Sequence, residues 1–210
     1  ASDGSSPQVI YSIPGRHLVW ARLNPQGTDI IYVDSTPKEL WMVNADGSNP
    51  RLFAPRVGNY ANRWASWSPD GTQVAYVSTD TVAVDNRIMV QAVDPSADYA
   101  PTGVPFPAAS QPDIDFHYVE WRPSLSDPQL LILDRNSPPN PFVVRPDGTG
   151  KTYLPPIPDT GTVTVGCWSP DGSQILYGTT ADGLYRIDYP SLTNRVKVVN
   201  GPVDFPVWRQ

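Results

Sequence analysis

The sequence predicts an all-β fold, and three observations carry this prediction. Proline accounts for 25 of the 210 residues, and a proline inside a helix removes a hydrogen bond and clashes with the preceding turn. Seven tryptophans and ten tyrosines argue against disorder, because disordered chains are poor in aromatic residues. The stretches between the prolines are rich in valine, isoleucine, tyrosine and tryptophan, which favour strands. Long helices are therefore not expected.

Internal repeats organise these strands. The string WSPDGTQVAYVS at 67–78 nearly recurs as WSPDGSQILYGT at 168–179, and weaker copies are LNPQGTDIIYVD at 23–34 and WRPSLSDPQLLILD at 121–134. The repeats are spaced by 44, 54, 47 and 40 residues, counted between the anchors Leu23, Trp67, Trp121, Trp168 and Trp208. Repeats of strands with such periods are typical of propeller blades. The sequence therefore predicts a β-propeller.

Each repeat predicts four strands. The first strand ends at the anchor, a Pro-Asp-Gly or similar turn follows, and an alternating second strand such as QVAYVS comes next. The third strands are expected in ELWMVN, RIMVQAVD, PFVVRP and GLYRIDY, and RLFAP at 51–55 is a fourth strand. One aspartate per turn is too few for calcium, which takes six to eight oxygens. Asp70 and Asp171 are instead expected to hydrogen-bond the backbone of their own turns.

We expect one propeller domain over residues 1–210, with four complete four-stranded blades. The repeats fall at approximately 16–58, 59–112, 113–160 and 161–201. Residues 1–15 align with 44–58, so residues 8–13 are predicted as a fourth strand, and residues 203–209 as a first strand. The segments 1–15 and 202–210 would then share a closing blade. Two interpretations stay open: a small ring of four or five blades, or an arc of a larger propeller.

The repeat strings also carry a resemblance to a known family. The WSPDG strands, together with WMVNADGSNPRL at 41–52, resemble the repeats of TolB-like β-propellers. Similar repeats occur in propeller domains attached to prolyl-oligopeptidase-type peptidases and in oligogalacturonate lyases. The resemblance covers nearly the whole chain and is weakest in the third repeat, at residues 124–127. It implies a bacterial, extracytoplasmic setting, periplasmic or at the cell surface, and a sensor or scaffold role. We expect no signal segment or membrane anchor within these residues.

Charge and composition argue against several classes of function. The net charge is −6 and basic residues form no run, whereas nucleic-acid binding needs clustered lysine and arginine. No apolar stretch approaches 18 residues, so membrane insertion is not expected. Cys167 is the single cysteine, which excludes an intrachain disulfide, and we interpret it as a small buried hydrophobic residue.

No complete catalytic motif is found. The string GTGKT at 148–152 lacks the upstream glycine of a phosphate-binding loop, because Arg145 stands at that position. A G-x-S-x-G nucleophile motif is missing from the sequence. The two histidines, His17 and His117, are too few for a zinc site, or for the histidine-rich metal centre that the resemblance to oligogalacturonate lyases implies. We therefore expect a protein that is not an enzyme and needs no cofactor.

The variable loops indicate which face of the propeller adapts to function. Loops between the second and third strands of each blade vary most, and function usually lies on loops carried by a rigid scaffold. The longest connection, residues 94–113, is rich in proline. It is expected to lie outside regular structure, either as a functional loop or as a proline-stiffened lid on the surface.

Two columns of the aligned first strands supply candidate residues. Three residues before each anchor the column is mostly aromatic, and it is expected to pack between blades: Trp20, Trp64, Tyr118, Val165 and Phe205. Four residues before each anchor the column is mostly polar and is expected to ring the channel mouth: Val19, Arg63, His117, Thr164 and Asp204. The candidate cluster, for which ordinary solvent-facing or ion-paired residues are the alternative, comprises Arg63, His117, Asp115, Glu120 and Asp204.

The predicted function is non-catalytic binding, in which a loop-decorated face docks a protein partner. Aromatic and charged side chains are the expected anchors of such an interface: Tyr60, Arg63, Tyr99, Phe106, His117 and Phe205. One alternative is binding of a carbohydrate or other small ligand at the channel mouth, with hydrolase or lyase activity included. This alternative predicts an open pocket with charged residues and an exposed aromatic side chain. The other alternative is a structural subunit whose incomplete propeller assembles with another chain, as a homo-oligomer or otherwise.

Overall fold

The computed structural model describes residues 8–80, 85–112, 116–134, 141–156, 163–179 and 182–201. Four sheets, each of four antiparallel strands, account for the strands of this part of the chain. The first sheet contains β1 (Leu18–Leu23), β2 (Asp29–Asp34), β3 (Glu39–Asn44) and β4 (Arg51–Ala54). The second contains β5 (Tyr60–Trp67), β6 (Gln73–Asp80), β7 (Asp85–Asp94) and β8 (Ala100–Pro112), with the 3-10 helix η1 (Pro95–Ala97) between its last two strands.

The other two sheets follow the same pattern. The third contains β9 (Phe116–Trp121), β10 (Leu130–Asp134), β11 (Phe142–Val144) and β12 (Thr152–Tyr153). The fourth contains β13 (Val163–Trp168), β14 (Gln174–Thr179), β15 (Gly183–Asp188) and β16 (Val196–Asn200). Within every sheet the strands pair in chain order. The predicted all-β fold with four complete four-stranded blades is confirmed.

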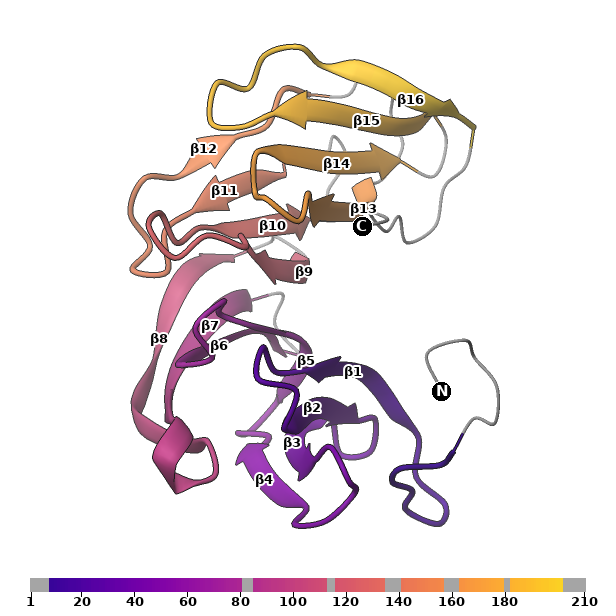
Figure 1. Cartoon of the computed structure of the whole chain (residues 1–210), viewed down its shortest axis with the longest axis vertical. Coiled ribbons are helices and arrows are strands. Elements are labelled where there is room, and N and C mark those ends of the chain that lie inside the picture. The colour runs from indigo at the N-terminus through magenta and orange to yellow at the C-terminus, as the bar shows by residue number, and fades with distance from the viewer. Residues whose placement is uncertain are drawn as a thin grey trace.

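The sheets follow one another along an arc, with β1, β5, β9 and β13 on its concave side (Figure 1). These four strands are the first strands of the blades, and each ends at its predicted anchor, from Leu23 to Trp168. Neighbouring first strands contact each other along the arc. The described chain therefore forms part of a propeller, in which the first strands face the central axis.

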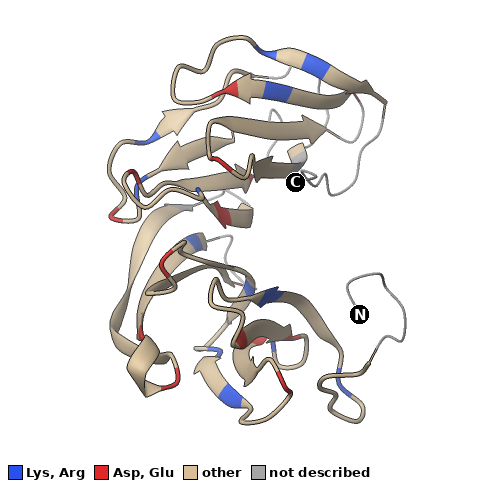
Figure 2. Cartoon of the chain, in the orientation of Figure 1, with Lys and Arg blue, Asp and Glu red and all other residues tan. Residues whose placement is uncertain are grey.

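Charged residues occur in all four blades (Figure 2). This distribution agrees with a sequence in which basic residues form no run. Short-range arrangements of charge around individual cavities are therefore more informative than any large charged surface.

The predicted N-terminal strand is wrong. Residues 8–13 have no regular secondary structure, although the segment lies against the first sheet, where the Tyr11 ring is 5.8 Å from the Tyr32 ring. A fourth strand must pair with the third strand of its own blade. In the first sheet, against which this segment lies, β4 already pairs with β3. The remainder of the predicted closing blade, residues 1–7 and 202–210, lies outside the described residues.

The proline-rich connection is a strand rather than a loop or lid. Residues 100–112 form β8, which pairs along most of β7. Proline lacks an N–H donor, so a sheet accepts it only where that donor would not be needed, as on an edge strand. The strand β8 is the outer edge of its sheet, and Pro101 and Pro107 stand opposite Val93 and Met89 there. Proline content alone therefore misled the sequence prediction.

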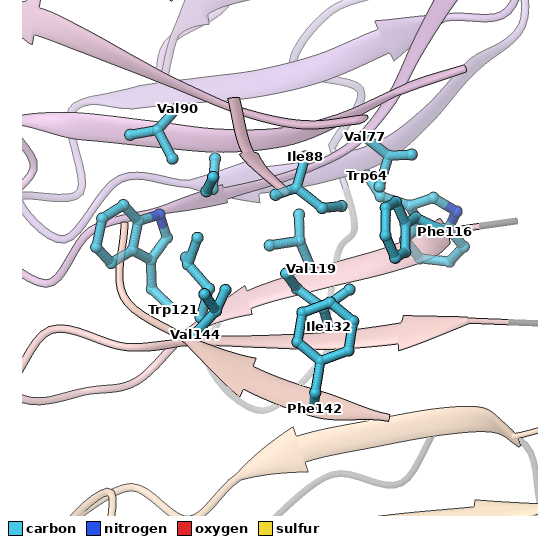
Figure 3. Packing of buried hydrophobic residues seen from close by; sticks show 13 residues of the cluster. Trp64, Val77, Ile88, Val90, Phe116, Val119, Trp121, Ile132, Phe142 and Val144 are labelled. Carbon is cyan, nitrogen blue, oxygen red and sulfur yellow. The ribbon is translucent and has the colours of Figure 1, made fainter. Parts of the chain in front are cut away.

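Packing between the blades supplies the core. Alternate residues of a strand point to opposite faces of a sheet, so each blade buries side chains against both neighbours. In β10, for example, Leu130 and Ile132 pack toward the second sheet, while Leu131 and Leu133 pack toward the fourth. The cluster between the second and third blades is shown in Figure 3 and includes Trp64, Ile88, Phe116, Val119, Trp121 and Phe142.

The Ser-Pro-Asp-Gly turns are held by their own side chains, as predicted. In the fourth blade the Asp171 carboxylate accepts hydrogen bonds from the Ser169 hydroxyl at 2.6 Å and from the backbone N–H of Ser173 at 3.0 Å. The Ser169 hydroxyl oxygen accepts the N–H of Gln174 at 2.9 Å. Ser68, Asp70 and Thr72 repeat this arrangement in the second blade, where the Asp70 carboxylate accepts the Ser68 hydroxyl at 2.6 Å and the Thr72 N–H at 3.0 Å. The hydrogen bonds lower the pKa of Asp171 to about 2.

We expect Asp171→Ala to destabilise the protein in a pH-dependent way. The pKa of this carboxyl is lower in the folded chain than its ordinary value of 3.8. The ionised group therefore stabilises the fold above about pH 4, and the contribution disappears as the pH falls through about 2. Urea unfolding of both proteins between neutral and acid pH measures the effect. A difference between them that stays constant down to the lowest pH would contradict this assignment.

Candidate functional site

A cavity of about 230 Å³ opens between β1, β5 and β9. These strands lie on the concave side of the arc (Figure 1). Five aromatic residues line the cavity: the anchors Trp67 and Trp121, and one further residue from each of the three blades, namely Trp20, Trp64 and Tyr118. Its polar groups come from the same three strands and include Arg22, Ser66 and Glu120. We take this cavity, named here the inner cavity, as the candidate functional site.

Three of these aromatic residues, Trp20, Trp64 and Tyr118, form a continuous file across the blades. The Trp20 and Trp64 rings stack with centroids 4.4 Å apart and planes at 28°. The Trp64 ring then meets the Tyr118 ring edge-on, at 5.4 Å and 65°. Offset stacks and edge contacts of this kind are favourable beyond the area they bury. The prediction that this column packs between blades is confirmed for these three residues, and Val165 and Phe205 lie where no side chain is described.

The backbone is strained at both tryptophans. Trp20 has φ 53° and Trp64 has φ 50°, which is the left-handed region that bulky residues rarely occupy. Strand pairing shifts register at the same two places, between β1 and β2 and between β5 and β6. Such bulges redirect side chains, and a strained residue costs on the order of 1–3 kcal/mol. The same backbone strain therefore occurs in the first two blades, at the two tryptophans whose rings stack on each other.

Polar side chains link the inner strands along the bottom of the cavity. The hydroxyl of Ser66 in β5 accepts the backbone N–H of Trp121 in β9 at 3.1 Å. The Glu120 carboxylate in β9 accepts the N–H of Trp168 in β13 at 3.0 Å. Ser66 and Glu120 each stand one residue before the anchor of their blade, and Arg22 holds this place in β1. The first strands are thus tied together by the residues that line the cavity.

Burial gives Glu120 unusual acid–base behaviour. Desolvation raises the pKa of Glu120 to about 7, although the Trp168 N–H and the positive charge of Arg22 act in the opposite direction. Burial also raises the pKa of Tyr118, and the Glu120 charge adds to this rise. Near neutral pH the Glu120 carboxyl therefore exists in both forms, so it can donate or accept a hydrogen bond.

The structure separates the predicted channel-mouth cluster. Glu120 lines the inner cavity, whereas Arg63 lines a second cavity and donates to the Thr79 hydroxyl at 2.8 Å. His117 is only 2% exposed, so its predicted place at an open mouth is wrong. The reason is a register shift in β9 between Phe116 and Tyr118, which breaks the alternation that the alignment assumed.

The predicted docking anchors also differ in exposure. Tyr99 is 7% exposed and packs edge-on against Trp67 at 5.4 Å, so its prediction as a surface anchor is wrong: the residue precedes β8 instead of lying in a free loop. Tyr60 is half-buried below the Arg87 guanidinium, at 4.9 Å from its ring centre. Phe106 is 51% exposed on β8. Three further candidates lie outside the described residues: Asp115, Asp204 and Phe205.

Two polar lining residues, Arg22 and Ser66, are not among the predicted site residues. A third alignment column, one residue before the anchor, would have indicated them, because it holds Arg22, Ser66 and Glu120 in the first three blades. In the fourth blade that column holds Cys167, which is buried with Leu176 and Leu184. The interpretation of Cys167 as a buried hydrophobic residue is therefore confirmed.

The described residues contain no group of three His, Cys, Asp or Glu side chains placed to hold a metal ion. In the inner cavity Glu120 is the one carboxylate among the described lining residues. These residues therefore do not fit a protein-bound metal centre. Among the same described segments, no helix has the length and apolarity that crossing a membrane requires.

Comparison with solved structures shows which folds this chain resembles. An oligogalacturonate lyase in complex with manganese superposes with a TM-score of 0.69 at 14% identity, over 91% of this chain and 55% of that chain. TolB from Acinetobacter baumannii gives 0.58 at 18% identity, over 88% and 41%. A puromycin-hydrolyzing peptidase of Mycobacterium tuberculosis gives 0.65 at 16% identity, over 94% and 34%.

These similarities show the β-propeller fold, and at such low identity they show the fold alone. The chain spans about half the length of the lyase and less of the other two proteins. In sequence, the chain matches no protein-family profile and no curated protein.

We expect Glu120→Gln to flatten the dependence of stability on pH. The unfolded chain releases the Glu120 proton near the ordinary value of 4.5, whereas the folded chain keeps it to about 7. Stability is therefore lost as the pH rises from about 4.5 to 7, and no more is lost above that. The glutamine oxygen can still accept the Trp168 N–H, so the variant is expected to fold. The measurement is the free energy of unfolding of both proteins across this pH range. Equal slopes of this free energy against pH would contradict the raised pKa of Glu120.

Proposed function

We propose that this chain is a non-catalytic, ligand-binding propeller domain, and that the inner cavity binds a carbohydrate. One observation carries the proposal: the 36% exposed indole of Trp20 shares a single cavity with Glu120 and Arg22. An open pocket with charged residues and an exposed aromatic ring is the combination expected from the sequence if the protein binds a carbohydrate or other small ligand.

The chemistry of the cavity suits a sugar. Small-ligand sites typically combine apolar and aromatic walls with a few placed polar groups. One face of a sugar ring carries C–H groups that can lie on an indole, and its hydroxyls can bond a carboxyl and a guanidinium. The volume of about 230 Å³ lies below the usual range of about 300–1,000 Å³ for ligand pockets. A single sugar ring is therefore a better fit than a large ligand.

Binding is favoured over hydrolysis. Glycoside hydrolysis generally uses two carboxyl groups on either side of the bond that breaks, and Glu120 is the one carboxylate among the described lining residues. A structural neighbour named for oligogalacturonate lyase supports a sugar as the ligand class. The resemblance of the repeats to TolB-like propellers supports an extracytoplasmic setting, which we include in the proposal.

Docking of a protein partner is the second candidate function. Phe106 and Val104 are exposed on β8 and border a cavity of about 440 Å³ between the second and third blades. Exposed apolar side chains beside a groove are typical of interaction sites. The burial of Tyr99 and His117 removes two of the predicted anchors, which is why we place this function second.

Isothermal titration calorimetry with a panel of neutral sugars, uronic acids and their short oligomers tests the primary proposal. We expect at least one sugar to bind, and Trp20→Ala to weaken its binding about tenfold or more, because about 1.4 kcal/mol of lost contact changes affinity tenfold. Trp41→Ala is the matched control, since Trp41 does not line the cavity and its indole bonds Glu39. The proposal would be contradicted if no sugar in the panel gave a heat signal, or if Trp20→Ala bound the sugar as tightly as the unchanged protein does.

A further inference from the structure

We propose that a second cavity, between the first two blades, binds a small carboxylate with an apolar body. This cavity, named here the basic cavity, has a volume of about 270 Å³. Its accessible apolar surface comes from Val19 and Trp20, with the buried Val33 and Ala61 behind them, and its polar groups include Lys38 and Arg63. The proposal is independent of the sugar-binding function assigned to the inner cavity.

Two cations line the basic cavity from different blades. Lys38 is an exposed residue that follows β2, and Arg63 lies on β5. Among the described lining residues none is an aspartate or glutamate. In a chain with a net charge of −6, two cations beside one small apolar surface form a local site for negative charge.

The backbone of Lys38 and the guanidinium of Arg63 are held in place. The Lys38 backbone has φ 75°, a left-handed conformation that costs free energy for any residue with a side chain. Its N–H donates to the Asp34 carbonyl at 2.9 Å, and its carbonyl accepts the N–H of Asn62 at 3.0 Å. Arg63 donates from Nη2 to the Thr79 hydroxyl at 2.8 Å. Lys38 is thus tied by its backbone to the neighbouring blade, on the rim of the cavity that Arg63 also lines.

The surroundings select the kind of anion. The accessible apolar side chains next to the cations, Val19 and Trp20, would make no favourable contact with a fully hydrated ion such as inorganic phosphate. An apolar body on those residues gains free energy from burial, while its carboxylate accepts charged hydrogen bonds from lysine and arginine. Serine and threonine hydroxyls, from Ser35 and Thr79, lie in the same lining. A short-chain monocarboxylate therefore fits the basic cavity better than phosphate or an uncharged alcohol.

Trp20 supplies a built-in reporter, because its side chain lines both cavities. A ligand in the basic cavity is expected to change the fluorescence of Trp20, although Lys38 and Arg63, and not Trp20, would bind its carboxylate. The inner cavity can be tested separately, since Glu120 lines only that one. Failure of one proposal is therefore distinguishable from failure of the other.

Fluorescence titration with hexanoate, hexanol and inorganic phosphate tests this inference. We expect saturable binding of hexanoate, at least fivefold weaker binding of hexanol and phosphate, and weakening by added salt. Lys38→Gln and Arg63→Gln should each weaken hexanoate binding at least fivefold, while Glu120→Gln leaves it unchanged. Lys38 is exposed, so its variant is expected to fold even if the Arg63 variant does not.

Lys151→Gln and Arg145→Gln are the matched controls, because both residues are cations of the third blade that do not line the basic cavity. They should bind hexanoate as the unchanged protein does. The inference is overturned if hexanoate does not bind, if hexanol or phosphate binds as tightly, or if Lys38→Gln binds no more weakly than Lys151→Gln.

Discussion

The stack of Trp20 on Trp64 is the contact on which both cavities depend. It joins the first strand of one blade to the first strand of the next, at 4.4 Å between ring centres. Trp64 then continues the contact to Tyr118 of the third blade. Trp20 lines both the inner cavity and the basic cavity, and Trp64 lines the inner cavity, so the Trp20 side chain stands between the two cavities. Removing this contact would change the shape of both cavities at once.

The surrounding structure stabilises the strained backbone of the two stacked tryptophans. Both tryptophans have left-handed backbone conformations, which persist only where neighbouring contacts determine the conformation. Trp64 is buried in the cluster between the second and third blades (Figure 3). Hydrogen bonds accepted by Ser66 and Glu120 also tie β5 to β9 and β9 to β13. Interblade packing and these links together hold the strained residues in place.

Much of the fold could be predicted from the sequence because the repeat preserves strand order. Anchors from Leu23 to Trp168 end the first strands as expected, and the serine and aspartate of each turn bond as expected. Proline content misled the prediction at β8, because whether proline is accepted depends on which edge of the sheet a strand occupies. That position is a tertiary property, and a composition count does not contain it.

The site was only partly predictable, for a related reason. The bulges lie at different places in the inner strands, at Trp64 in β5 and at His117 in β9. The polar column four residues before the anchors therefore does not map onto one ring of side chains, although the aromatic column does from Trp20 to Tyr118. Glu120 was found because it is acidic and close to the others in sequence, whereas Arg22 and Lys38 were not. Lys38 reaches its cavity through a loop conformation and a contact with the next blade, and neither leaves a pattern in the sequence.

A double-mutant cycle between Trp20 and Trp64 tests the central role of the stack most directly. Trp20→Ala, Trp64→Leu and the double variant are compared by the free energy of unfolding in denaturant, with leucine chosen to keep apolar bulk at the buried position. We expect a coupling energy of about 0.5–1.5 kcal/mol, as for other aromatic pairs. Effects that add to within about 0.3 kcal/mol would show that the two rings do not support each other, and would contradict this account.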